Sequence, residues 1–87
     1  MEDKVVKCIL LDVDTVLITE LIEMDAQLGD PNCKLVNPYR FTGEINDMKP
    51  WKSDVTNQSE FMIRSDEILT IADPTSEITE KYLELAV

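Results

Sequence analysis

The sequence lacks histidine, and it has only two cysteines and two glycines among its 87 residues. Without histidine the chain has no imidazole for general base catalysis or for metal ligation. Two glycines also leave no glycine-rich loop that could surround a phosphate group. We therefore expect no catalytic residues, no metal ion and no other cofactor, and we predict that the protein is not an enzyme.

Long hydrophobic runs are absent as well. No stretch approaches the roughly 18 to 20 apolar residues that a membrane-spanning helix needs. The opening residues Met1-Glu2-Asp3-Lys4 do not resemble the basic start of a signal peptide. We therefore expect a soluble cytoplasmic protein, in which Cys8 and Cys33 are buried free thiols; a disulfide is possible only if their two strands are adjacent.

Positive charge is scarce: eight basic residues face eighteen acidic ones, which gives a formal net charge of −10. A field of this sign repels nucleic acid and anionic membranes at long range. A chain of 87 residues forms one small domain that buries only about 60 to 65% of its unfolded surface. Oligomerisation would therefore add useful stability.

Short apolar runs bounded by turn residues predict strands. Five such runs cover residues 5–11, 15–26, 33–39, 61–64 and 68–72. The second has apolar side chains on both faces, as expected of a strand that bends and changes partners in a small barrel. The sequence thus predicts a mainly β fold, a five-stranded, strongly bent antiparallel sheet in the form of a small open barrel.

Turn and helix signals divide the rest of the chain. Gly29-Asp30-Pro31 predicts a turn, and residues 42–59 are expected to form strand extensions around 45–55 with an exposed hairpin tip. Asp73-Pro74 predicts the N-cap and first position of an amphipathic C-terminal helix over 74–86. We expect a single domain over 1–87, with the β-barrel core at 5–73.

Three blocks of the sequence resemble the two motifs of Sm and Sm-like proteins of the Lsm and Hfq type. They lie at residues 19–25, which end in Asp25, at 32–35, which begin with Asn32, and at 63–71, which include Arg64-Ser65. The similarity covers about residues 5–73 and is greatest to small Sm-like proteins attributed to cyanophages. This resemblance implies a homo-oligomeric ring of about five to seven subunits, in which the fourth strand pairs with the fifth strand of a neighbour.

The resemblance also implies a pocket for a base of single-stranded RNA near the pore of the ring. Its residues would be Asp25, Asn32, Arg64 and Ser65, because a carboxylate and an amide can bond a base edge and a guanidinium can stack on its face. Gln27 stands at the position where Sm-like proteins usually have an aromatic or histidine side chain that stacks on the base. Three additional residues precede Asn32, so Asn37 is an alternative for its role.

Each residue of this candidate pocket also has a structural interpretation. Asp25 could accept backbone N–H groups of the Leu28-Gly29 turn, and Arg64 could form an ion pair with Asp25 or Asp66. Asn32 is also typical of a turn.

Basic and aromatic residues alternate in two further places, Tyr39-Arg40-Phe41 and Lys49-Pro50-Trp51-Lys52. Tyr39, Arg40, Trp51 and Lys52 are therefore secondary candidates for stacking against single-stranded RNA. Trp51 is also typical of a core or interface residue.

A competing motif, Asp12-Val13-Asp14, resembles the nucleophile motif of haloacid-dehalogenase-type phosphatases, in which Asp12 would attack phosphorus beside a Mg²⁺ ion. That chemistry requires a parallel α/β sheet, so we interpret these residues as a β-turn between the first two strands. Two hypotheses remain. The first is an Sm-like ring that binds single-stranded RNA, and the second is a homo-oligomeric structural or interaction module that has lost RNA binding.

Overall fold

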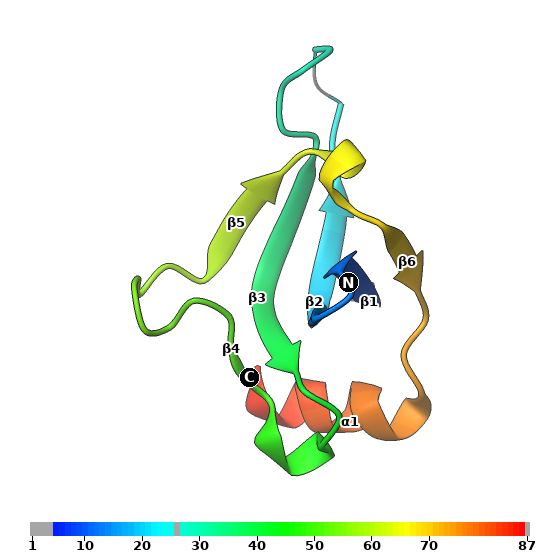
Figure 1. The fold of residues 1–87 in the computed structure, drawn as a ribbon, viewed down its shortest axis with the longest axis vertical. Coiled ribbons are helices and arrows are strands. Elements are labelled where there is room, and N and C mark those ends of the chain that lie inside the picture. Colours follow the sequence, from blue (N-terminus) through cyan, green and yellow to red (C-terminus); the bar gives the residue numbers. More distant parts are fainter. Residues whose placement is uncertain (1–4, 26, 87) are drawn as a thin grey trace, which may run out of the picture.

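The computed structural model describes residues 5–25 and 27–86. Its strands are β1 (Val6–Asp12), β2 (Thr15–Glu23), β3 (Cys33–Phe41), β4 (Lys49–Pro50), β5 (Glu60–Ile63) and β6 (Thr70–Ala72). Two 3-10 helices, η1 (Ile45–Asp47) and η2 (Ser65–Glu67), precede the α-helix α1 (Ser76–Leu85). The predicted mainly β fold with a short C-terminal helix is confirmed (Figure 1).

The sheet is antiparallel, with the order β4-β3-β2-β1-β6, and β5 also pairs with β3. The predicted number of five strands is wrong, because Lys49 and Pro50 pair with Arg40 and Tyr39 to make a sixth. β5 and β6 follow one another through η2 but lie at opposite sides of the sheet, and within the described residues they do not pair (Figure 1). The sheet is therefore bent and unclosed.

The second strand buries side chains on both faces, and each face belongs to a different core. One core, inside the bend of the sheet, contains Ile9, Leu17, Leu21, Cys33 and Leu35. The other contains Ile18 of β2, Met48 and Tyr82 of α1. The apolar residues on both faces of β2 thus reflect a bent sheet whose second face packs against a helix.

Tyr82 fixes α1 to the sheet. Its side chain is 1% exposed, and its hydroxyl donates to the Val36 carbonyl (2.9 Å) and accepts from the Glu20 N–H (3.1 Å). The Tyr39 ring packs edge-on against the Tyr82 ring at 5.8 Å, and the Tyr39 hydroxyl donates to the Leu85 carbonyl (3.0 Å). Two tyrosines therefore connect β2, β3 and α1.

The helix begins two residues later than the sequence predicts. Thr75 is the N-cap, and its hydroxyl oxygen accepts from the Ile78 N–H at 3.3 Å. The predicted N-cap residue, Asp73, instead accepts from the Lys7 ammonium at 2.5 Å. The predicted start at Asp73-Pro74 is wrong, because Asp73 is held by β1.

Burial raises the pKa of the Tyr82 phenol above its ordinary value of 10.0. The folded state therefore holds this proton more tightly than the unfolded state does, so the stabilisation is complete below pH 10.0 and is lost as the pH rises above it. We expect chemical unfolding to show a fall in stability between about pH 9 and pH 11. Tyr82→Phe has no phenol at this position and should lose less stability over that interval; equal losses would contradict the prediction.

Residues 42–59 differ most from expectation. Strand extensions around 45–55 are wrong, because residues 45–47 form η1, only Lys49 and Pro50 pair with β3, and residues 51–55 turn. Lys52 has a left-handed backbone (φ 62°), and its carbonyl accepts from the N–H groups of Val55 and Thr56. This turn ends the pairing that began at β4.

The prediction that both cysteines are buried free thiols is confirmed in part. Cys8 and Cys33 are free thiols, but Cys33 is buried whereas Cys8 is partly exposed. In residues 5–25 and 27–86, no helix has the length and apolarity required to span a bilayer.

Candidate functional site

The candidate site lies where the β2–β3 loop meets the turn between β5 and η2. The Asn32 side chain accepts from the Ser65 N–H (2.8 Å) and donates to the Ser65 hydroxyl (3.2 Å). The Asn32 N–H also donates to the Ile63 carbonyl at 3.2 Å. The Asn32 side chain is thus joined to Ser65, which is 33 positions away in the sequence, and the backbone of Asn32 is joined to Ile63 beside it.

Arg64 lies beside this junction, and its guanidinium is bound to two carboxylates. Its Nη2 atom donates to Glu67 Oε1 at 2.8 Å, and its Nε atom is 3.6 Å from Asp66 Oδ1. The hydrogen bond to Glu67, with the charge of Asp66 next, raises the pKa of Arg64. The predicted ion pair with Asp66 is present. The side chain remains 46% exposed.

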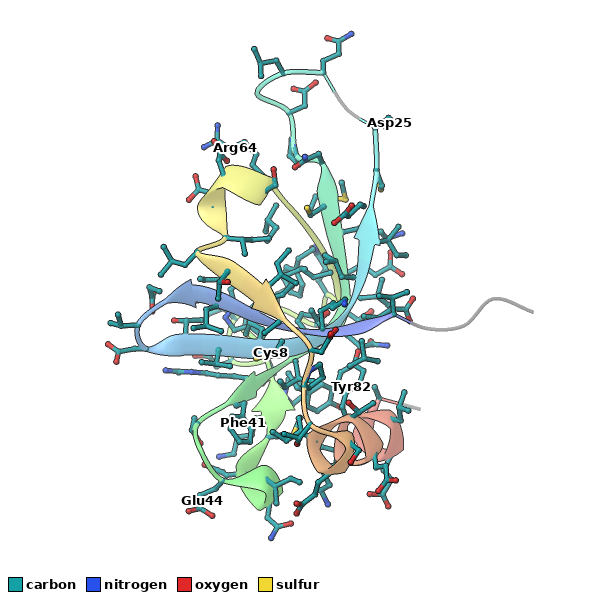
Figure 2. The ribbon with its side chains drawn as sticks, turned by 90° about the vertical axis from the view of Figure 1, so that its right-hand side faces the viewer. Cys8, Asp25, Phe41, Glu44, Arg64 and Tyr82 are labelled. Atoms are coloured by element: carbon teal, nitrogen blue, oxygen red, sulfur yellow. The ribbon has the colours of Figure 1, made fainter. Side chains whose placement is uncertain are left out.

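Two hollows share Asn32 and Ser65. One, of about 250 Å³, is lined by Gln27, Leu28, Gly29, Asp30, Asn32, Arg64, Ser65 and Asp66. The other, of about 500 Å³, is lined by Glu23, Met24, Asp25, Asn32, Cys33, Ser65 and Ile71. Asp25 and Arg64 therefore belong to different hollows, and Figure 2 shows them at the same end of the molecule but apart.

The residues of the β2–β3 loop are mostly exposed, and they line the hollows more than they form hydrogen bonds. Asp25 and Gln27 are exposed, and the turn is closed by the Asp30 N–H donating to the Gln27 carbonyl at 3.0 Å. Among the described residues, no hydrogen bond joins Asp25 to the Leu28-Gly29 turn. Asn37 lies elsewhere, where its N–H donates to the Ser59 carbonyl at 2.7 Å.

The secondary candidates divide between two places. Trp51 packs against the core inside the bend, with its ring 5.2 Å from that of Phe61, so its predicted role in packing is confirmed. Lys52 Nζ is 5.6 Å from the centre of the Trp51 ring. Tyr39 contacts Tyr82 of α1, whereas Arg40 is exposed beside Lys49 and Lys52. No local signal in the sequence predicts that Phe61 lies beside Trp51, because only the fold of residues 51–60 brings the two rings together.

The Asp12-Val13-Asp14 motif forms the turn between β1 and β2. Asp12 Oδ1 accepts from the Asp14 N–H at 2.8 Å, and this bond lowers the pKa of Asp12. β1 and β2 are antiparallel, so the two carboxylates do not lie on the parallel sheet that the phosphatase mechanism requires. Among the described residues, no group of three or more acidic, cysteine or histidine side chains could hold a metal ion.

One family model matches residues 4–87, almost the whole chain, and its description is "Family of unknown function (DUF6561)". No curated protein and no solved structure matches the chain. The resemblance to Sm-like proteins therefore stays a prediction from the sequence.

Proposed function

We propose that this chain, which belongs to the DUF6561 family, is an Sm-like subunit that assembles through β5 and β6 into a closed homo-oligomeric ring. The observation that carries the proposal is the position of these strands. They lie at opposite sides of an unclosed sheet, and they correspond to the fourth and fifth strands that the resemblance pairs between neighbours. Antiparallel pairing between β5 of one copy and β6 of the next would cover both edges.

The directions of the backbone groups support this pairing. The Asn37 N–H donates to the Ser59 carbonyl, and this pair continues the register of β3 with β5. In an antiparallel ladder, hydrogen-bonded pairs alternate with pairs that are not hydrogen-bonded. The backbone groups of Phe61 and Ile63 therefore face β3, and the N–H of Met62 faces outward. At the other edge, the Leu21 N–H donates to the Val5 carbonyl in the register of β1 with β2. By the same alternation, the backbone groups of Ile9 face β2, and those of Cys8 and Leu10 face β6. Ile71 therefore points its backbone N–H and C=O away from β1.

The side chains at these edges support assembly too. Met62 is 43% exposed and Ile71 is 41% exposed. Neither β5 (Glu-Phe-Met-Ile) nor β6 (Thr-Ile-Ala) contains a lysine or a proline, the residues that commonly protect an edge strand from pairing. Each edge strand is short, so a single contact between β5 and β6 is weak. In a closed ring every copy makes two such contacts, and this favours assembly of the ring.

Sedimentation of the protein at micromolar concentration tests the proposal. We expect one species whose mass is a whole multiple, about five to seven, of the 9.9 kDa chain. A mass of 9.9 kDa across this range would contradict it.

A second candidate function is binding of single-stranded RNA by the assembled ring. The observation that favours it is the hollow of about 250 Å³ in which the half-exposed Arg64 lies beside the Asn32 and Ser65 side chains. Asp25 would contribute from the neighbouring hollow. Assembly is the better supported function, because Arg64 already binds two carboxylates and the net charge is −10.

Glu67→Gln should strengthen binding of short U-rich RNA if Arg64 contacts the strand, because the substitution removes the carboxylate closest to the guanidinium. Arg64→Ala should abolish binding, and its sedimentation should show that the ring is intact. Fluorescence anisotropy at several salt concentrations, with A-rich RNA for comparison, measures both effects. Absence of binding up to about 100 μM at low salt, where attraction is greatest, would reject RNA binding at this site.

A further inference from the structure

Another pair of hollows lies away from Asn32 and Ser65, where the segment after β4 folds beside β3. The first has a volume of about 270 Å³ and is lined by the rings of Trp51 and Phe61 and by three amide residues, Asn37, Asn57 and Gln58. The two rings meet at 63°, and both residues remain partly exposed. This hollow combines an aromatic wall with neutral hydrogen-bonding groups.

The second hollow, of about 310 Å³, shares Pro50, Trp51 and Ser53 with the first. It is lined by Arg40, Lys49 and Lys52, which are three of the eight basic residues in the sequence. Asp54 is the one carboxylate among its lining residues, so three cations face one carboxylate within the hollow, in a chain of net charge −10. Two more carboxylates lie near its rim: Asp47 Oδ1 is 3.8 Å from Lys49 Nζ, and the pKa of Asp12, which the Asp14 N–H lowers most, is lowered further by the charge of Arg40.

Two residues with left-handed backbones border these hollows. Asn37 has a φ of 53° and lines the first, and Lys52 has a φ of 62° and lines the second. Glycine adopts this conformation more easily than any residue with a Cβ atom. The sequence nevertheless places an amide and an ammonium side chain at these positions.

We propose that the two hollows together bind one nucleotide unit. Its planar base would lie in the first hollow against Trp51, where the amide of Asn37 can bond the base edge, and its phosphate would lie in the second beside Lys52 and Arg40. Ligand pockets usually measure about 300 to 1,000 Å³, so 270 Å³ suits a single ring system. This site is separate from Arg64 and does not rest on ring assembly.

The protein contains one tryptophan, so its fluorescence reports directly on the proposed site. We expect saturable quenching of Trp51 emission by uridine or adenosine monophosphate, or by short single-stranded U-rich or A-rich oligonucleotides. Quenching by the mononucleotides would show that a free nucleotide is sufficient for binding. Quenching by oligonucleotides alone identifies a nucleic acid strand as the source of the nucleotide. No quenching by either up to about 1 mM, the range of a small ligand with few contacts, would overturn the proposal.

Asn37→Gly and Lys52→Gly remove the proposed contacts while keeping the backbone conformation that each position requires. Thermal unfolding should show both variants to be at least as stable as the parent chain. Each should weaken quenching by at least about fivefold, whereas Arg64→Ala, which also removes one positive charge, should leave it unchanged. Unchanged quenching in both glycine variants would overturn the proposal, and so would loss of quenching in Arg64→Ala alone.

Discussion

Tyr82→Ala is expected to lower the free energy of unfolding by about 3 to 5 kcal/mol, the usual effect of truncating a large buried aromatic side chain. Tyr82 is 1% exposed and lies at the centre of the core between α1 and the sheet. Its removal leaves a cavity between Ile18 and Met48, and it leaves the Glu20 N–H and the Val36 carbonyl without their partner. Denaturant unfolding followed by circular dichroism measures the loss.

Tyr82→Phe is the matched control, because it removes the hydroxyl and keeps the ring. We expect the free energy of unfolding to fall by a smaller amount, about 1 to 3 kcal/mol. The packing of the ring is kept, and the Glu20 N–H and the Val36 carbonyl lose only their bonds to the hydroxyl. A loss from Tyr82→Ala below about 1 kcal/mol would mean that α1 does not contribute to the core in this way.

Met62→Pro is expected to convert the ring to single chains of 9.9 kDa. The Met62 N–H faces away from β3, so proline removes no hydrogen bond within the subunit. It does remove a donor that β6 of the neighbouring copy would use. A backbone hydrogen bond contributes about 0.5 to 1.5 kcal/mol, and the ring loses one at every interface. Sedimentation measures the mass, and circular dichroism checks the fold.

Two neighbouring variants make this result specific. Met62→Ala keeps the N–H and should assemble, although more weakly because apolar contact is lost. Phe61→Pro removes a bond to β3 and should destabilise the subunit itself. Assembly of Met62→Pro equal to that of the parent chain would show that β5 is not the contact edge.

The first two strands of the chain were predictable because their sequences determine them locally. β1 and β2 are runs of apolar and β-branched residues separated by Asp12-Val13-Asp14, and the turn forms there through the Asp12 carboxylate. Residues 42–59 were not predictable in the same way. Their path depends on β4 finding the edge of β3 and on the left-handed turn at Lys52, neither of which has a clear local signal.

The candidate site was predictable in its location but not in its contacts. The order of the motifs places Asn32 and Arg64-Ser65 at one end of the sheet, and the structure joins Asn32 to Ser65 there. The sequence could not determine the state of Arg64, because carboxylates two and three residues later compete with Asp25 for the guanidinium. Arg64 pairs with these two carboxylates, and Asp25 lines a different hollow.

Amide hydrogen exchange at Met62 and Ile71 tests the proposed pairing of β5 with β6 most directly. Both N–H groups face away from their own neighbouring strands, so they would exchange rapidly in a single chain and slowly in a ring. We predict strong protection of both amides at concentrations where the ring forms, and loss of that protection in Met62→Pro at Ile71. Rapid exchange at both positions in the concentrated parent protein would contradict the account.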